Sequence, residues 1–520
     1  MKAERLFRVL GLVDEDLIEE AASPTARQRN FPLRKALAAV ACLVLICGVS
    51  WLVTGGFRGM GNSSFPAESS GSGISTDSEP SSEKGTTFMS YAGPVFPLTL
   101  SEENGGLTAE RKTTWDFAPG TYQDGSLRQW GATATDSCTL VNITESDQAV
   151  TVLYPFTGSF TELASQRPTV TVDGKEAEST LFAGAYVGGF RDAGVDDGST
   201  WNLKYPDSWM DYKALLEDGR YLDASLNDGP ALDIPVTVYE FTDFTAPANY
   251  DAATQAIDFT IDQKETTVLT YGFNGGSWDP DTGWRQYSYF VPNGVRRDKN
   301  PKLLVVLGED IEDYALGGYE NGGCETKIDG VSCTVTRREM TLDQVLDQLC
   351  RSYLETYADW QYGMDAGEVA AVPFDLFRRA VGELMVQYGP MAGGGTVDRY
   401  ADGRLDDIIS EAMSMDRVLY LAVPVTVPAG SKVNITFKLW KEPSFDFGCS
   451  GSENIGLQGY DFVTRLGSNL DFTEQRAALE NTDNIQIERQ NFGFDLEKGV
   501  TEVTLDLETE HYYLEIQAKD

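Results

Sequence analysis

The sequence predicts a mainly β protein with helical insertions, in which a β-sandwich ectodomain follows one N-terminal transmembrane helix. Three observations lead to this expectation. Residues 36–57 form an uncharged, largely apolar run long enough to cross a bilayer. After residue 88, short β-branched runs alternate with turn residues, as in antiparallel sandwiches. Residues 341–416 instead carry apolar side chains at helical spacing.

Length and charge limit the classes of function. The chain has 520 residues, which is enough for roughly two to four domains. Its 41% hydrophobic content is sufficient for a sizeable core. With 80 acidic and 41 basic residues, the formal net charge is −39. Such a polyanionic surface repels phosphate backbones, so we expect no nucleic-acid partner.

The apolar run at 36–57 predicts a single-pass membrane protein. Residues 1–35 contain seven Lys or Arg, whereas only Arg58 follows the run directly, so the N-terminus is expected in the cytoplasm and the C-terminal domains outside. A cleavable signal peptide is disfavoured because 35 residues precede the run. A lipoprotein is disfavoured because Ile46 before Cys47 is not small, and too little apolar sequence precedes Cys42.

The cytoplasmic segment, residues 1–35, begins with an amphipathic unit. Its apolar side chains follow the i, i+3, i+4, i+7, i+11 series of one helix face: Leu6, Val9, Leu10, Val13 and Leu17. So short a segment cannot make its own core. Two interpretations stay open: a helix on the membrane surface or a targeting remnant, and a docking helix for a cytoplasmic protein.

The extracytoplasmic part is expected to begin with a flexible tether. Residues 58–87 are rich in Ser and Gly and lack apolar periodicity. Residues 88–340 then predict a β-sandwich with a helical insert, 341–416 a helical region, and 417–520 a C-terminal β domain. The sequence leaves open whether the two β regions form one domain or two.

Five cysteines lie beyond the predicted membrane helix, and two of them are close in sequence. Cys324 and Cys333 would face each other across a hairpin with a four-residue loop, which allows a disulfide. A two-residue turn at Asp329-Gly330 would put them out of register. The sequence leaves both arrangements open.

The sequence contains few of the residue patterns on which enzyme catalysis commonly depends. His511 is the single histidine and reads as part of a terminal strand, so no catalytic triad is expected. The sequence contains no HExxH or CxxC motif, and we predict neither a catalytic residue, a metal site nor a cofactor. Paired carboxylates are too numerous to identify a glycosidase, which leaves a hydrolase as the least favoured class.

Tryptophans beside acidic loops are the most suggestive binding residues. Trp278 and Trp284 bracket the Asp279-Pro-Asp281 loop, and Trp201 and Trp209 flank another stretch. Exposed Trp next to Asn or Asp can stack on sugar rings while the polar groups hydrogen-bond their hydroxyls. Core packing stays the favoured interpretation of all four, with ligand binding as the alternative.

Two resemblances add to this interpretation. The start, Met1-Lys-Ala-Glu-Arg-Leu-Phe-Arg-Val-Leu-Gly-Leu-Val-Asp-Glu-Asp-Leu-Ile-Glu-Glu-Ala21, followed by basic residues and one anchor, resembles single-pass envelope proteins of clostridia-like Gram-positive bacteria with an anti-sigma-factor-like N-terminus. It implies a cytoplasmic sigma factor or other protein as partner. The stretch 138–156 with Pro168-Thr-Val-Thr-Val-Asp-Gly174 is similar to sandwich modules of the inter-alpha-trypsin-inhibitor type, which bind rather than catalyse.

Together these observations predict a membrane-anchored extracytoplasmic binding or sensing protein that is not an enzyme. The leading hypothesis is an anti-sigma-like envelope regulator whose N-terminal helices hold a cytoplasmic partner. The alternative is a cell-surface adhesion or glycan-binding module that contacts the cell wall through its loop tryptophans.

Overall fold

The computed structural model describes the second of the two units into which the chain divides, 1–70 and 71–520. The described residues are 93–121, 127–128, 130–161, 163, 167–186, 209–218, 229–292, 301–359, 372–392, 400–446 and 456–519. The predicted cytoplasmic segment, membrane helix and tether therefore lie outside them. No helix among the described residues combines the length and apolar character that a membrane crossing needs.

The prediction of a mainly β protein is confirmed, and its largest sheet contains seven strands. In spatial order these are β24 (Glu502–Thr504), β22 (Asp471–Glu480), β2 (Leu107–Asp116), β5 (Ala132–Asn142), β19 (Lys432–Lys441), β7 (Thr169–Val172) and β8 (Lys175–Glu176). The pair β2–β22 is parallel, and the other pairs are antiparallel. Side chains of β2 and β5 alternate between buried and more exposed positions, as expected for a sheet with one face on a core.

Two four-stranded sheets pack on the other side of this core. One is β1 (Thr99–Leu100), β6 (Gln148–Gly158), β18 (Arg417–Val427) and β9 (Thr180–Tyr186), and the other is β20 (Phe445–Asp446), β21 (Leu457–Val463), β25 (His511–Ala518) and β23 (Ile485–Gln490). A parallel bridge between Val95 and Phe462 links them. Tyr154 stacks on Phe437 across the core at 4.0 Å between ring centroids. We call these three sheets the large sandwich.

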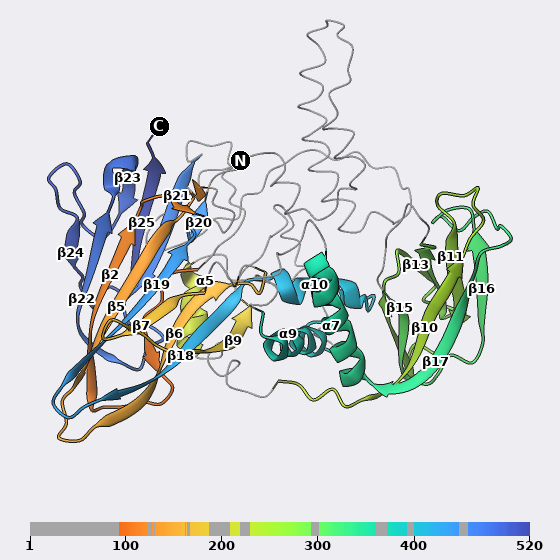
Figure 1. The fold of residues 1–520 in the computed structure, drawn as a ribbon, viewed down its shortest axis with the longest axis horizontal. Helices are drawn as coiled ribbons and strands as arrows, with labels where there is room; N and C mark the ends of the chain where they lie inside the picture. Colours follow the sequence, from red (N-terminus) through yellow and green to blue (C-terminus); the bar gives the residue numbers. More distant parts are fainter. Residues whose placement is uncertain are drawn as a thin grey trace, which may run out of the picture. The chain divides into compact units, whose positions relative to one another are not determined.

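Strands from both ends of the described chain interleave in the large sandwich. β18 lies between β6 and β9, and β19 lies between β5 and β7. Figure 1 shows this as orange and blue strands alternating in one sheet. Strands before and after residue 417 therefore share hydrogen-bond ladders, which bears on whether the two β regions form one domain or two, a point that the sequence left open. Local sequence could not reveal this pairing, since strand partners are chosen by long-range packing.

Residues 235–341 form a second pair of facing sheets, which we call the insert sandwich. Its first sheet is β12 (Thr266–Tyr271), β15 (Lys302–Gly308), β10 (Pro235–Thr245) and β17 (Ser332–Thr341). Its second sheet is β13 (Gly275–Trp278), β14 (Trp284–Phe290), β11 (Thr254–Thr260) and β16 (Tyr314–Tyr319). Aromatic side chains from both sheets, including Phe241, Phe273 and Tyr289, pack in its own core.

Three helices cover the remaining face of the first insert sheet. They are α7 (Leu342–Asp359), α9 (Phe374–Gln387), which follows Pro373, and α10 (Leu405–Ser414). Consecutive residues of β15 divide between the two sides: Val306 packs in the insert core, whereas Val305 packs in the cluster that contains the helices. Burial on both faces explains the uninterrupted apolar run of β15.

The smaller elements complete the described fold. Helix α5 (Trp209–Asp218) lies in the connection from β9 to β10. The two-residue strands β3 (Gly120–Thr121) and β4 (Leu127–Arg128) pair with each other, and a 3₁₀ turn spans Thr482–Asn484.

A buried ion pair joins the layers of the large sandwich. Arg111 on β2 donates to Asp136 on β5 at 2.8 to 3.2 Å, and its side chain is fully buried. The same guanidinium donates to the carbonyl oxygens of Val463, at 2.8 Å, and Phe96, at 2.7 Å, in the opposite layer. It also lies 4.3 Å from the ring centroid of Phe462. One cation thus connects strands that are more than 300 residues apart.

A second polar contact fixes α10 on the insert sandwich. Gly272, just after β12, has φ +78°, and its N–H donates to both carboxylate oxygens of Asp406 at 2.9 Å. A Cβ at position 272 would come within 2.3 Å of the Pro301 carbonyl oxygen, so glycine is required there. Burial raises the pKa of Asp406 to about 6, although the Gly272 N–H opposes that shift.

The buried pair predicts unequal effects for two neighbouring cations. Arg111→Met should lower the free energy of unfolding by about 3–5 kcal/mol, because it strands the Asp136 carboxylate in the core. Lys112→Met, the matched control, removes an exposed bond of 2.7 Å to Glu502 and should cost at most about 1 kcal/mol. Urea unfolding of both variants measures the difference, and equal losses would contradict the role given to Arg111.

The raised pKa of Asp406 predicts that its contribution to the free energy of unfolding depends on pH. Its pKa is higher in the folded chain than its ordinary 3.8, so its contribution is complete below that pH and is lost as pH rises through about 6. Asp406→Asn keeps an acceptor for Gly272 but carries no charge. Relative to wild type, the variant should gain on the order of 2 kcal/mol between pH 4 and pH 7.5.

Urea midpoints of wild type and Asp406→Asn at the two pH values test this gain. Asp407→Asn is the control, since Asp407 is 40% exposed and lies 3.6 Å from Arg404. A pH response that is the same in both variants would show that burial of Asp406 is not its source.

Candidate functional site

The tryptophans singled out as ligand-binding residues do not form one surface. Trp201 lies outside the described residues. Trp209 begins α5, is only 5% exposed, and stacks on His511 at 4.3 Å between ring centroids. Trp209 is therefore packed in the interior, as the favoured interpretation had it, because helix α5 buries this ring against a sheet. Trp278 and Trp284 remain as candidates.

Trp278 and Trp284 lie on opposite faces of the β13–β14 hairpin. The hairpin closes through bonds from the Asp279 N–H to the Trp284 carbonyl, at 2.9 Å, and from the Gly283 N–H to the Asp279 carbonyl, at 3.0 Å. Trp278 is paired with Arg285, so these two share a face, and Trp284 belongs to the other. Trp278 is 52% exposed and Trp284 is partly exposed. The two rings therefore flank the same loop but belong to different surfaces.

Trp284 belongs to a polar face, which we call the Trp284 face. It is the side of the second insert sheet that points away from the core. Trp284 is opposite Thr260, and the next cross-strand pair on the same face of the sheet is Gln286 with Asp258. The Gln286 amide Nε2 donates to the Asp258 carboxylate at 2.8 Å. An aromatic ring, an amide, a carboxylate and a hydroxyl thus lie on the same side of two neighbouring strands.

Sequence reasoning missed Asp258, Thr260 and Gln286 on this face. A usable signal was present in β14, where polar and aromatic residues alternate from Gln286 to Tyr289. That period of two predicts that Gln286 shares the side of Trp284, while Tyr287 points to the core. Asp258 and Thr260 could not have been found in this way, because only the β11–β14 register places them beside the ring.

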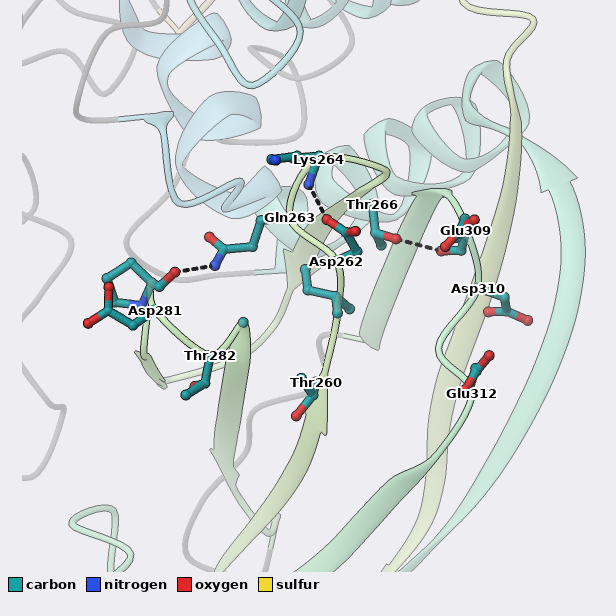
Figure 2. A pocket seen from close by; sticks show the side chains of 13 residues that line it. Thr260, Asp262, Gln263, Lys264, Thr266, Asp281, Thr282, Glu309, Asp310 and Glu312 are labelled. Carbon is teal, nitrogen blue, oxygen red and sulfur yellow. Dashed lines mark hydrogen bonds between the residues drawn. The ribbon is translucent and has the colours of Figure 1, made fainter.

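An open groove of about 1060 Å³ adjoins this face at the end of the insert sandwich (Figure 2). Three connections form it: the turn after β11, the β13–β14 turn, and the link from β15 to β16. The lining residues are Thr260, Ile261, Asp262, Gln263, Lys264, Thr266, Pro280, Asp281, Thr282, Gly283, Glu309, Asp310 and Glu312. Since Thr260 belongs to both the groove and the Trp284 face, the two are continuous.

The groove is acidic, with five carboxylates and one Lys among its lining residues. Asp310 is held toward β17, where it accepts bonds from Arg337 Nε and the Tyr239 hydroxyl, each at 2.8 Å. Burial tends to raise the pKa of Asp310, but these two donors outweigh it and lower the pKa overall. Gln263 donates to the Pro280 carbonyl at 2.8 Å, which ties two of the three connections together.

The two cysteines considered for a disulfide are free thiols. Cys324 hydrogen-bonds with Ser288, whereas Cys333 hydrogen-bonds with Tyr289. Ser288 and Tyr289 are consecutive residues of β14 and point to opposite faces. Of the two arrangements that the sequence left open, the structure therefore has the one without a Cys324–Cys333 bond, because the second insert sheet separates the thiols. Burial raises the pKa of both, which keeps them protonated at neutral pH.

Of the remaining residues singled out from the sequence, some lie outside the described residues and others lie within them. The docking series Leu6, Val9, Leu10, Val13 and Leu17 lies outside the described residues. His511 is in β25, as the sequence suggested, and its Nε2 lies 2.9 Å from Asp461 Oδ1. Within the described ranges, no three His, Cys, Asp or Glu side chains are grouped so as to hold a metal ion.

Comparison with known proteins assigns no family. No family model matches the sequence, and no curated protein matches it. Among solved structures, the N-terminal domain of the Streptococcus gordonii adhesin Sgo0707 aligns over 84% of this chain and 88% of that one, with 8% identity and a TM-score of 0.11. A TM-score this low supports no statement about fold or function.

Proposed function

We propose that this chain is a membrane-anchored binding protein of the cell envelope whose insert sandwich recognises a glycan at the Trp284 face. The observation that carries the proposal is the juxtaposition of Trp284 with the Gln286–Asp258 pair, which are bonded at 2.8 Å on adjacent strands. A sugar ring offers an apolar face for stacking and a rim of hydroxyls for hydrogen bonds. These two needs match the residues of this face.

Rigid placement favours binding at this face. Every residue named lies on β11 or β14, or at the end of one of them, rather than on a long loop. A preformed surface loses little conformational freedom when it binds, which favours affinity. The adjoining groove adds Gln263, Thr266 and Thr282 as further hydrogen-bonding partners along an extended polymer. We infer a role in binding rather than catalysis, with a cell-wall or other surface polysaccharide as ligand.

The opposite faces of the hairpin provide a sharp test. Trp284→Ala should raise the Kd of residues 88–520 for a binding polysaccharide by about tenfold, equivalent to about 1.4 kcal/mol of lost stacking. Trp278→Ala is the matched control, since it removes a similarly placed indole from the other face and should leave the Kd unchanged. Pull-down on insoluble peptidoglycan and titration with soluble polysaccharides measure both effects.

Gln286→Ala should weaken binding in the same direction as Trp284→Ala, because it removes the amide and frees Asp258. If Trp278→Ala weakens binding and Trp284→Ala does not, the ligand uses the other side of the hairpin. If no cell-wall or surface polysaccharide binds, the glycan proposal is wrong.

For the other end of the chain we propose a regulatory contact, with a sigma factor as the cytoplasmic partner. The apolar series from Leu6 to Leu17 favours this role, because an amphipathic helix of that length needs a surface to cover its apolar face. Together with the predicted helix at 36–57, it would couple an envelope ligand to a cytoplasmic protein.

A tagged peptide of residues 1–35 should recover a sigma factor from lysate of the source cells. Val9→Asp with Val13→Asp should abolish the recovery, because two charges interrupt the apolar face. The matched control is Glu15→Gln with Glu19→Gln, which changes the polar side only. Recovery of membrane lipid alone would instead support the surface-helix interpretation.

A further inference from the structure

The Trp284 face consists of successive rows of residues that run across its strands. Residues directly opposite each other on neighbouring strands share one side of a sheet, and every second residue of a strand returns to that side. In order along the face, the rows are Phe290, Thr254 and Tyr319; then Ser288, Ala256 and Gly317; then Ser277, Gln286, Asp258 and Ala315; and last Trp284 and Thr260.

The exposure of this face changes sharply between its second and third rows. Ser288 is 6% exposed and Ala256 is 0% exposed, although both lie on the side that points away from the insert core. The third and fourth rows are open, with Thr260 exposed and Trp284 and Gln286 partly exposed. Something other than the core therefore covers the first two rows.

The connection from β16 to β17 provides this cover, and we call its residues 320–328 the covering loop. The thiol of Cys324 hydrogen-bonds with Ser288 of the second row. A Cβ on Gly322 would lie 3.4 Å from the ring of Phe290 in the first row, so the loop backbone itself packs against that ring. The loop thus contacts both covered rows.

Backbone bonds hold the covering loop against the sheet. The Ile328 N–H donates to the Gly318 carbonyl at 3.0 Å, and the Glu320 N–H donates to the Thr326 carbonyl at 3.0 Å. These bonds continue β16 into a short hairpin, of which residues 321–325 are the turn. The covering loop is therefore a wall that is already in place before a ligand binds.

The wall stands one row beyond the polar pair. Trp284 and Gln286 follow each other along β14, so a ligand that contacts both of them runs along the strand. Successive positions on one side of a strand are about 7 Å apart, and one such step beyond Gln286 leads to the covered Ser288. In the other direction, Thr260 leads into the open groove. Along the strands, the site thus has one blocked end and one open end.

We propose that the Trp284 face binds the terminal sugar of a polysaccharide strand and excludes sugars from the interior of the strand. This inference rests on the proposed function, since it names the part of a glycan that the face takes. An internal sugar is linked on two sides and needs space at both ends of the site. A terminal sugar is linked on one side, and the groove gives that side an exit.

The residues next to the wall match the chemistry of a strand end. A terminal sugar carries a hydroxyl where an internal sugar carries its second linkage. A hydroxyl both donates and accepts hydrogen bonds, whereas a linkage oxygen only accepts. The Asp258 carboxylate accepts and the Gln286 amide can do both, so this row can bond the additional hydroxyl.

Peptidoglycan with cut glycan strands tests the inference on the full-length protein. Partial digestion with a muramidase creates strand ends, while the peptide cross-links keep the material insoluble. A preparation with about three times as many ends should bind about three times as much wild-type protein at saturation. Partial digestion of the peptide cross-links is the control, since it loosens the mesh without creating strand ends and should leave the bound amount unchanged.

Variants show whether the additional binding uses this site. Trp284→Ala should lose the gain on cut peptidoglycan, whereas Trp278→Ala, on the other side of the hairpin, should keep it. Replacement of residues 321–325 by Asn-Gly leaves Glu320 bonded to Thr326 across a two-residue turn, but removes Cys324 from Ser288. In this variant the ratio of protein bound to cut and to intact peptidoglycan should fall from about three to about one.

The wild-type comparison decides the matter even if the shortened loop folds poorly. Equal binding of wild type to intact and cut peptidoglycan would overturn terminal recognition and leave the proposed function standing. A gain that also follows digestion of the cross-links would overturn it too, because access rather than strand ends would be the cause. Absence of binding to both preparations would overturn the inference, and the proposed function would fall with it only if soluble polysaccharides also fail to bind.

Discussion

The large sandwich depends on one buried cation. The guanidinium of Arg111 bonds Asp136 within its own sheet and two backbone carbonyls, those of Phe96 and Val463, in the facing layer. A charge so deep in a β core is tolerated only when nearly every donor is used, and here it also covers the ring of Phe462. Strands from both ends of the described chain must be present before these partners exist.

This dependence explains why the two sandwiches differ in which of their faces are used for packing. The large sandwich closes around residues that come before and after the insert, so its faces are used for packing, including the face that α5 covers. The insert sandwich has its own aromatic core, and helices cover its first sheet. Its second sheet carries polar side chains away from the core, and this is where Trp284, Gln286 and Asp258 lie. Packing thus leaves these three side chains partly exposed, and the proposed recognition is placed there for that reason.

The candidate site was only partly predictable from sequence. Trp284 could be chosen because a Trp beside an acidic turn is unusual, and alternation in β14 would have added Gln286. Asp258 could not be chosen, since nothing in its own strand distinguishes it from the many other acids of the chain. The sequence could not tell whether Trp278 and Trp284, or Cys324 and Cys333, share one side of the sheet, and the reason is the same for both pairs. Closeness in sequence does not tell which side of a sheet a side chain takes.

The sequence by itself determined the mainly β class, the helical character of residues 341–416 and the acidic surface, because periodicity and composition act locally and sum along the chain. It also placed His511 in a terminal strand. The tertiary structure alone decided that β18 and β19 enter the N-terminal sheets, that Trp209 is buried against His511, and that Asp258 lies beside Gln286. Each of these depends on contacts between residues far apart in the chain, where register and burial, rather than local pattern, set the free energy.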